Sequence, residues 1–128
     1  MRIGVFADVH GNLAALNAVL VDGREQQVER WVCLGDVAFK GPQPVECVET
    51  IAALPGIVQI QGNTDQWLTR GFPAGFQPPE ERKRQLTEFR TWGLEQLRLE
   101  HLQRLRLLPL QYARHGCGER LLCVHSSP

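Results

Sequence analysis

The 128-residue sequence contains no apolar run near the roughly 20 residues that a membrane-spanning helix needs. It also lacks net charge, because fourteen basic residues balance fourteen acidic ones, so no overall field attracts nucleic acid or anionic lipid. The four cysteines form no CxxC pair, which favours reduced thiols over a disulfide scaffold. The first residues run straight into Asp8 and His10, unlike a signal peptide. We therefore expect a globular, cytoplasmic protein with no membrane partner and no strong signal for nucleic-acid binding.

The length is typical of one domain, and 43% hydrophobic with 22% charged residues is enough to build a core. We find no internal repeat and no linker, so residues 1–128 are expected to form a single domain. Short apolar runs predict strands, and apolar residues at helical spacing predict helices. The predicted strands are 3–7, 31–34, 57–60 and 121–124; the predicted helices are 13–23, 44–53 and a long stretch over 80–108 with Gly93 as a candidate break.

Strands that alternate with helices indicate the α/β class with a largely parallel sheet. Each predicted strand is followed at once by a polar residue that can bind metal, and these residues are Asp8, His10, Asp36, Asn63 and His125. Because the carboxyl ends of parallel strands meet at one edge of a sheet, the five side chains are expected to converge.

The donor atoms form a chemically coherent set. Carboxylate oxygen, imidazole nitrogen and amide oxygen suit divalent cations such as zinc, manganese or iron better than copper(I). Two such cations about 3.5 to 4 Å apart can share a carboxylate, activate water and clamp the oxygens of a phosphoryl group. The set therefore predicts a hydrolase arrangement.

Four ordered segments carry a resemblance to a known family. Asp8-Val9-His10-Gly11-Asn12, Gly35-Asp36 through Gly41-Pro42, Gly62-Asn63-Thr64-Asp65 and His125-Ser126-Ser127-Pro128 resemble successive motifs of calcineurin-like metallophosphoesterases, in order and in spacing. The resemblance implies an α/β/β/α sandwich, of which this chain would be a truncated N-terminal part.

The resemblance also implies roles for individual residues. Asp8 and His10 would bind one metal ion, Asp36 would bridge two, and Asn63 and His125 would bind the other. Two divalent ions (Mn, Fe, Zn or Ni) would then activate a hydroxide that hydrolyses a small phosphorylated substrate, a phosphate monoester or diester. Asp36, Asn63 and Thr64 would be catalytic residues, and Lys40 and Asn63 would contact the substrate.

Three departures from the family pattern modify these expectations. Thr64 stands where the family commonly has a histidine, and a hydroxyl does not easily supply a proton near pH 7, which favours diester or activated substrates. Lys40 keeps only the positive charge of the family's second motif, and a solvated surface lysine is an equal alternative. The family's later Gly-His-x-His is absent from this sequence. We therefore expect a truncated chain with impaired activity and an exposed sheet edge inclined to self-association.

Several alternatives stay open at this level. The chain could be a non-catalytic remnant or binding domain that keeps the fold. His115, Cys117, Cys123 and His125 could instead bind one zinc ion if a hairpin brought them together. A Rossmann domain is disfavoured, since no Gly-x-Gly-x-x-Gly follows the first predicted strand. Three polar residues have simpler expected roles: Asn12 as a helix cap, Asp65 as a loop organiser and His101 as a packed structural side chain.

Overall fold

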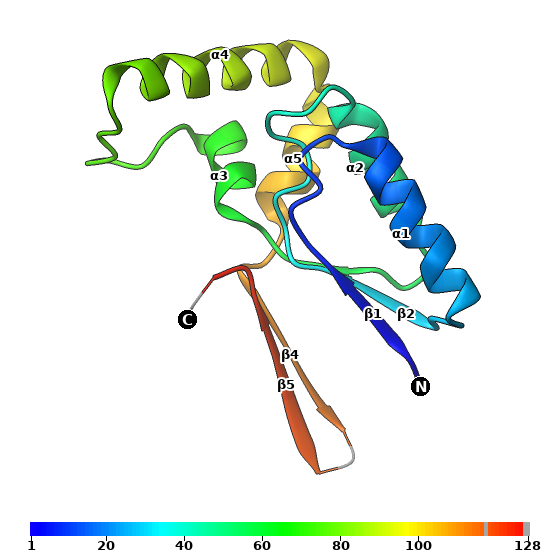
Figure 1. The fold of residues 1–128 in the computed structure, drawn as a ribbon. Helices are drawn as coiled ribbons and strands as arrows, with labels where there is room; N and C mark the ends of the chain where they lie inside the picture. The colour runs from blue at the N-terminus through cyan, green and yellow to red at the C-terminus, as the bar shows by residue number, and fades with distance from the viewer. Residues whose placement is uncertain (117, 127–128) are drawn as a thin grey trace.

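A computed structural model describes residues 1–116 and 118–126 and gives the mixed α/β architecture shown in Figure 1. The described strands are β1 (Ile3–Phe6), β2 (Arg30–Cys33), β3 (Val58–Gln59), β4 (Gln111–Gly116) and β5 (Glu119–Val124). The described helices are α1 (Leu13–Glu25), α2 (Pro44–Ala52), α3 (Asn63–Arg70), α4 (Glu80–Gln96) and α5 (Leu99–Leu107).

The first three strands form a parallel sheet in the order β1-β2-β3. Val5 pairs with Val32, and Cys33 pairs with Gln59. Both crossovers step across the sheet in the same direction, so right-handed connections place α1 and α2 on the same face. The two helices pack against each other there. The prediction of an α/β fold with a parallel sheet in this part of the chain is confirmed.

Trp31 anchors the helix-covered face of the sheet. It is 9% exposed, and its indole packs edge-on against Phe6 with ring centroids 5.8 Å apart. A Cβ atom on Gly4 would lie 2.6 Å from this ring, and one on Gly23 would also overlap it. Gly23 lies inside α1, where the absence of a side chain leaves room for the Trp31 ring. The prediction that the helix over 13–23 ends at Gly23 was therefore wrong.

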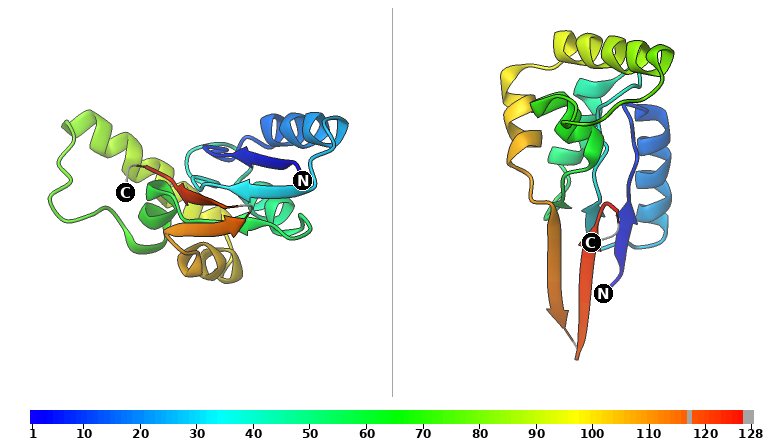
Figure 2. Two further views of the ribbon diagram at one scale, coloured as in Figure 1. Left: turned by 90° about the horizontal axis from the view of Figure 1, so that it is seen from below. Right: turned by 90° about the vertical axis from the view of Figure 1, so that its left-hand side faces the viewer.

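The C-terminal strands form a separate antiparallel hairpin, visible in Figures 1 and 2. The fourth predicted strand lies within β5 and pairs with β4, with Tyr112 opposite Cys123, so it does not extend the parallel sheet as expected. Sequence analysis missed β4 because Gln111–Gly116 contains polar and basic residues and no apolar run. The end of β5 nevertheless returns to the carboxyl edge of the parallel sheet, as contacts of His125 with Leu34 and Asn63 show.

The long predicted helix is divided at a different residue from the one expected. Gly93 lies inside α4, and the break falls at Leu97 and Arg98, both of which have extended backbone. There the ring nitrogen Nδ1 of His101 accepts the backbone N–H of Arg98 at 3.1 Å and caps α5. His101 is 5% exposed and its Nε2 lies 3.0 Å from Glu49 in α2, which confirms its structural role.

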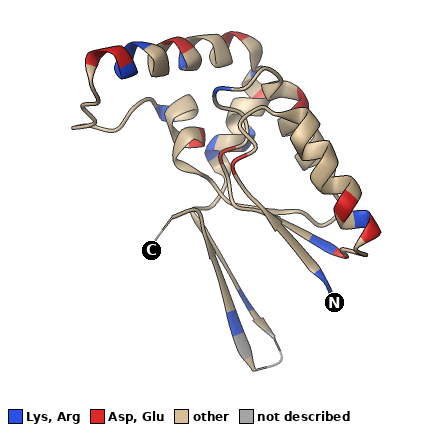
Figure 3. Cartoon of the chain, in the orientation of Figure 1, with Lys and Arg blue, Asp and Glu red and all other residues tan. Residues whose placement is uncertain are grey.

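The charged helix α4 carries basic and acidic residues interspersed along its length (Figure 3). This pattern agrees with a solvated helix face rather than with a basic surface for nucleic acid. Among the described helices, none combines the length and apolar character required to cross a membrane.

Candidate metal centre

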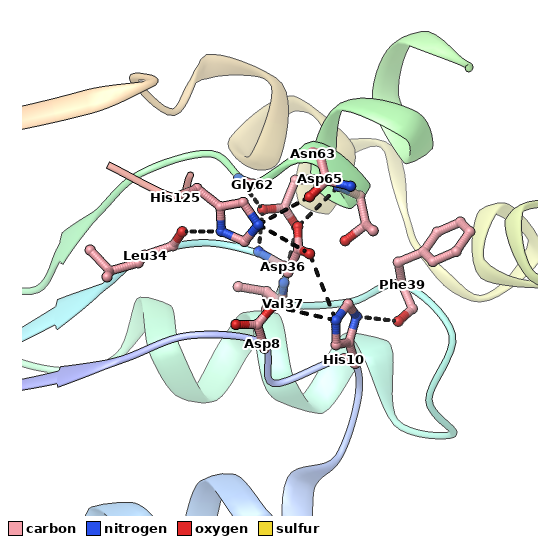
Figure 4. A network of polar contacts seen from close by, with 11 residues as sticks. Asp8, His10, Leu34, Asp36, Val37, Phe39, Gly62, Asn63, Asp65 and His125 are labelled. Carbon is pink, nitrogen blue, oxygen red and sulfur yellow. Dashed lines mark hydrogen bonds and ion pairs between the residues drawn. The ribbon is translucent and has the colours of Figure 1, made fainter. Parts of the chain in front are cut away.

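The polar residues that follow the strands lie close together (Figure 4). Asp8 and His10 follow β1, Asp36 follows β2, Asn63 opens α3 just after β3, and His125 follows β5. Four of these residues come from the carboxyl edge of the parallel sheet, while His125 is supplied by the hairpin. All five side chains that the sequence singled out as metal ligands therefore meet in one place.

Asp8, His10 and Asp36 form the first half-site. Each offers one ligand atom, and these atoms all lie within 4.8 Å of one another. His10 Nε2 lies 3.6 Å from Asp8 Oδ1 and 3.7 Å from Asp36 Oδ2. Carboxylate and imidazole donors at this separation match the ligands and the spacing that a divalent cation requires.

Asp36, Asn63 and His125 form the second half-site. His125 Nε2 lies 3.3 Å from Asp36 Oδ2 and 3.0 Å from Asn63 Oδ1. The oxygen Asp36 Oδ2 thus faces both histidines, one in each half-site. Asp36 is therefore the residue that the two groups have in common.

Both histidines are oriented by backbone carbonyl groups. His10 Nδ1 lies 3.0 Å from the carbonyl oxygen of Phe39, and His125 Nδ1 lies 2.7 Å from that of Leu34. Because a carbonyl oxygen can only accept, each Nδ1 carries a proton, and in the neutral ring this tautomer leaves Nε2 free to bind a cation. Such outer hydrogen bonds fix the ring and the tautomer of metal-binding histidines. The donor set therefore fits divalent cations.

The side chain of Asp36 is held by the first turn of α3. It is 4% exposed, and its Oδ1 accepts the backbone N–H of Thr64 at 2.9 Å, which leaves Oδ2 for the site. Asp65 is fully buried and accepts the backbone N–H groups of Asp36, Val37 and Gly62 at 2.8, 3.0 and 2.8 Å. Asp65 therefore joins the second and third motifs, and its predicted role as a loop organiser is confirmed.

The burial of Asp65 has an electrostatic consequence. Desolvation raises the pKa of this carboxyl above its ordinary value, and its backbone hydrogen bonds oppose the shift. The Asp65 carboxylate accepts hydrogen bonds from backbone N–H groups and does not face the cation site, so its negative charge stabilises the backbone of the loops. Among the described residues the three N–H groups have no other acceptor, so the Asp65 carboxylate satisfies all three.

The backbone is strained at three of the five metal-ligand candidates. Asp8, His10 and Asp36 have φ angles of 57°, 47° and 57°, in the left-handed region that non-glycine residues seldom adopt. Strain of this kind costs about 1–3 kcal/mol per residue and gathers at functional sites. Sequence analysis did not detect it, since only the adjacent glycines Gly11 and Gly35 hint at unusual turns.

A close backbone approach locks the first two loops together. A Cβ atom on Gly11 would lie 2.8 Å from the carbonyl group of Gly41, and one on Gly41 would overlap the carbonyl oxygen of His10. The hydrogen bonds from His10 N–H to Asp36 and from Gly11 N–H to Val37, at 2.9 and 2.8 Å, run alongside this contact. Only glycine at these positions lets His10 approach Asp36.

Two further candidates lie beside the half-sites without belonging to them. Thr64 is 6% exposed, and its hydroxyl has no hydrogen-bond partner among the described residues. Lys40 is exposed in the loop after β2, with a φ of 91°, directly after the Phe39 carbonyl that orients His10. Both residues are therefore near the metal-ligand candidates in the sequence. The catalytic role of Thr64 and the substrate contact of Lys40 are proposals.

The alternative zinc site is not assembled among the described residues. His115 pairs with Arg120 near the tip of the hairpin and lies on the face opposite to Cys123, which pairs with Tyr112. His125 is turned toward Asp36 instead, and Cys117 lies outside the described residues. Cys33 and Cys123 are free and buried, as expected for small core side chains. Asn12 also has its expected role, because its Oδ1 accepts the N–H of Ala15 and caps α1.

Comparison with known proteins agrees with this geometry. Residues 1–120 match the family model of the calcineurin-like phosphoesterase superfamily domain. The chain belongs to that superfamily. It is 31% identical, over 98% of its length and 49% of the relative, to the uncharacterized protein MJ0912 of Methanocaldococcus jannaschii.

Two solved structures resemble the fold of this phosphoesterase-family chain. A metallophosphoesterase from Sphaerobacter thermophilus is 37% identical with a TM-score of 0.69, and the match covers 88% of this chain and 43% of that one. The hypothetical protein PH1004 from Pyrococcus horikoshii is 25% identical with a TM-score of 0.78, covering 94% and 52%. The chain thus spans about half the length of the relatives that it matches. Superfamily membership and the Asp8, His10 and Asp36 group together support a metal-dependent phosphoesterase.

Proposed function

We propose that this chain contributes the metal-binding core of a phosphoesterase that hydrolyses phosphate monoesters or diesters with two divalent cations. The observation that carries the proposal is the position of Asp36 Oδ2, 3.7 Å from His10 Nε2 and 3.3 Å from His125 Nε2. One carboxylate oxygen between two oriented imidazoles is the arrangement that a bridged pair of cations needs. Mn, Fe, Zn and Ni all suit this mixture of oxygen and nitrogen donors.

The division of labour follows from the half-sites. Asp8 and His10 would hold one cation, Asn63 and His125 would hold the other, and Asp36 would contact both. When bound, such a pair supplies Lewis acidity, which lowers the pKa of water and neutralises phosphoryl oxygens. The task of the chain is to fix the donors, and the Phe39 and Leu34 carbonyls do so for the two rings.

Thr64 and Lys40 would act on the substrate. The Thr64 hydroxyl has no partner within the described part of the chain, and the Thr64 backbone N–H donates to Asp36, so the hydroxyl can hydrogen-bond a phosphate oxygen when the side chain turns toward the site. Lys40 can add a positive charge from its exposed loop. Neither supplies an imidazole to protonate a poor leaving group, which favours diesters or esters of acidic alcohols.

Cation binding tests the proposal most directly. Calorimetric titration with Mn²⁺ should show binding to the parent chain, and Asp36→Asn should weaken it by at least about tenfold, the scale of one lost charged ligand. Asp22→Asn, at an exposed position in α1, removes the same charge away from the site and should bind as the parent does. Hydrolysis of p-nitrophenyl phosphate and bis-p-nitrophenyl phosphate in Mn²⁺ is then compared for all three proteins. Equal Mn²⁺ affinity of the parent and Asp36→Asn would contradict the proposed centre.

A non-catalytic binding domain is the second candidate, and the threonine at position 64 is the observation that favours it. Under this alternative the parent would bind Mn²⁺ through Asp36 and turn over neither ester. Replacing Thr64 by histidine would distinguish the two functions, because a restored acid should raise monoester turnover only where the centre already supports hydrolysis.

A further inference from the structure

A cavity of about 280 Å³ opens directly beside the second half-site. Asn63 and His125, which are 3.0 Å apart through Oδ1 and Nε2, form the end nearest to Asp36. The cavity extends away from them between the start of α3 and the hairpin. Its remaining walls are formed by Gln61, Gln66, Leu110, Gln111, Val124 and Ser126.

The walls of the cavity carry no carboxylate, ammonium or guanidinium group. None of the lining residues is aspartate, glutamate, lysine or arginine, although 22% of the chain is charged. Beside the aliphatic Leu110 and Val124, the lining consists of amides, a hydroxyl and the His125 imidazole, groups that both donate and accept hydrogen bonds. A charged ligand would lose water here without meeting an opposite charge, which is costly, whereas a hydroxyl or amide group would find partners.

Gln61 contributes a deeply buried residue to the wall of the cavity. The side chain is 2% exposed, and its Nε2 donates to the carbonyl oxygen of Leu105 at 2.7 Å. This hydrogen bond holds the Gln61 amide in place and makes it a fixed part of the wall.

We propose that this cavity binds the organic group of the ester and selects substrates in which that group is uncharged and carries hydroxyl or amide functions. The inference rests on the proposed phosphoesterase function, because the phosphoryl group must lie at Asp36 for its organic group to reach past Asn63 and His125. Gln66 and Gln111 are the specificity-determining residues. They come from α3 and β4, line the cavity from two sides and are accessible to a bound ligand.

Three diesters with the same p-nitrophenyl leaving group test the selection at constant phosphoryl chemistry: the p-nitrophenyl esters of glycerol 3-phosphate, phosphocholine and 3-phosphoglycerate. Their second organic groups are neutral, cationic and anionic. The parent chain in Mn²⁺ should release p-nitrophenol from the glycerol 3-phosphate ester with a kcat/KM about tenfold above those of the other two, the ratio expected for one unpaired charge in a neutral pocket. Gln66→Glu and Gln111→Glu should each shift the ratio toward phosphocholine. Gln103→Glu, on the exposed side of α5, adds the same charge elsewhere and should leave the ratio unchanged.

A binding measurement separates the selectivity of the cavity from the hydrolytic activity of the chain. In ¹⁵N spectra of the parent chain, glycerol 3-phosphate should shift the side-chain amide signals of Gln66 and Gln111 more than 3-phosphoglycerate does. Equal kcat/KM for the three esters, or an unchanged ratio in Gln66→Glu, would overturn the proposed selectivity of the cavity. The proposed phosphoesterase function would not be affected by this result. Absence of hydrolysis of these esters, of p-nitrophenyl phosphate and of bis-p-nitrophenyl phosphate would overturn the proposed function, and the amide signals would then decide whether the cavity binds neutral groups at all.

Discussion

Replacement of Asp65 by asparagine should destabilise the chain more than any other change of a single carboxylate. The two carboxylate oxygens accept three backbone N–H groups, from Asp36, Val37 and Gly62. In asparagine one oxygen becomes an amide nitrogen, which faces those donors with another donor. The best orientation keeps two bonds, leaves one buried N–H unpaired at roughly 1–3 kcal/mol, and removes the charge that strengthened the remaining two by about 1 kcal/mol each.

Part of this loss is recovered. Burial raises the pKa of Asp65, so the neutral amide avoids some of the cost of desolvating a carboxylate. The net expectation is a loss of about 3 kcal/mol in the free energy of unfolding. With a urea dependence of roughly 2 kcal/mol per molar, the unfolding midpoint should fall by roughly 1–2 M.

Urea unfolding followed by far-ultraviolet circular dichroism measures this difference. Asp22→Asn is the matched control, because it makes the same change at an exposed position of α1 and should alter stability by less than about 0.5 kcal/mol. If Asp65→Asn unfolded at the same urea concentration as this control, the carboxylate would not be what joins the loops after β2 and β3.

Three further changes test other parts of the structure. Burial raises the pKa of the Cys33 thiol to about 12 from 9.0. The stability that the protonated thiol contributes is therefore present below pH 9 and falls by roughly 4 kcal/mol as the pH rises toward 12. In Cys33→Ala the fall in the urea midpoint at alkaline pH should be smaller than in the parent. Gly41→Ala places a Cβ atom on the carbonyl group of His10 and should weaken Mn²⁺ binding by calorimetry, whereas Gly75→Ala meets no atom within 4 Å and should not. His101→Ala removes a buried helix cap and should lower the free energy of unfolding by about 1–3 kcal/mol in urea titration; an unchanged midpoint would refute that role.

The parts of the fold that sequence analysis predicted share one property. β1, β2 and α1 are marked by local apolar patterns, so their periodicity is visible without knowledge of the tertiary structure. The ends of the helices were harder to place. Gly23 and Gly93 look like helix breakers in isolation, yet both lie within helices, and Gly23 is there because Trp31 from a distant strand occupies the space of its side chain.

The hairpin illustrates a different limit. Gln111–Gly116 has no apolar run, and it becomes a strand only because it pairs with β5. Strand formation that depends on a partner leaves little local signal. For the site, the order of the motifs predicted which side chains would meet, but the carbonyls of Phe39 and Leu34 carry no side-chain signature. The orientation of His10 and His125 was therefore invisible in the sequence.

Backbone hydrogen bonds orient three of the metal-ligand candidates. Asp36 is held through Oδ1 by a backbone N–H group, and both histidines are held through Nδ1 by backbone carbonyls. Three candidates adopt left-handed φ angles, which oppose folding and must be offset by contacts such as those of Asp65. The strained turns thus place two carboxylates and two imidazoles close together. We expect the affinity of the site to depend both on the number of donors and on the backbone contacts that orient them, because outer hydrogen bonds fix the orientation of metal-binding side chains.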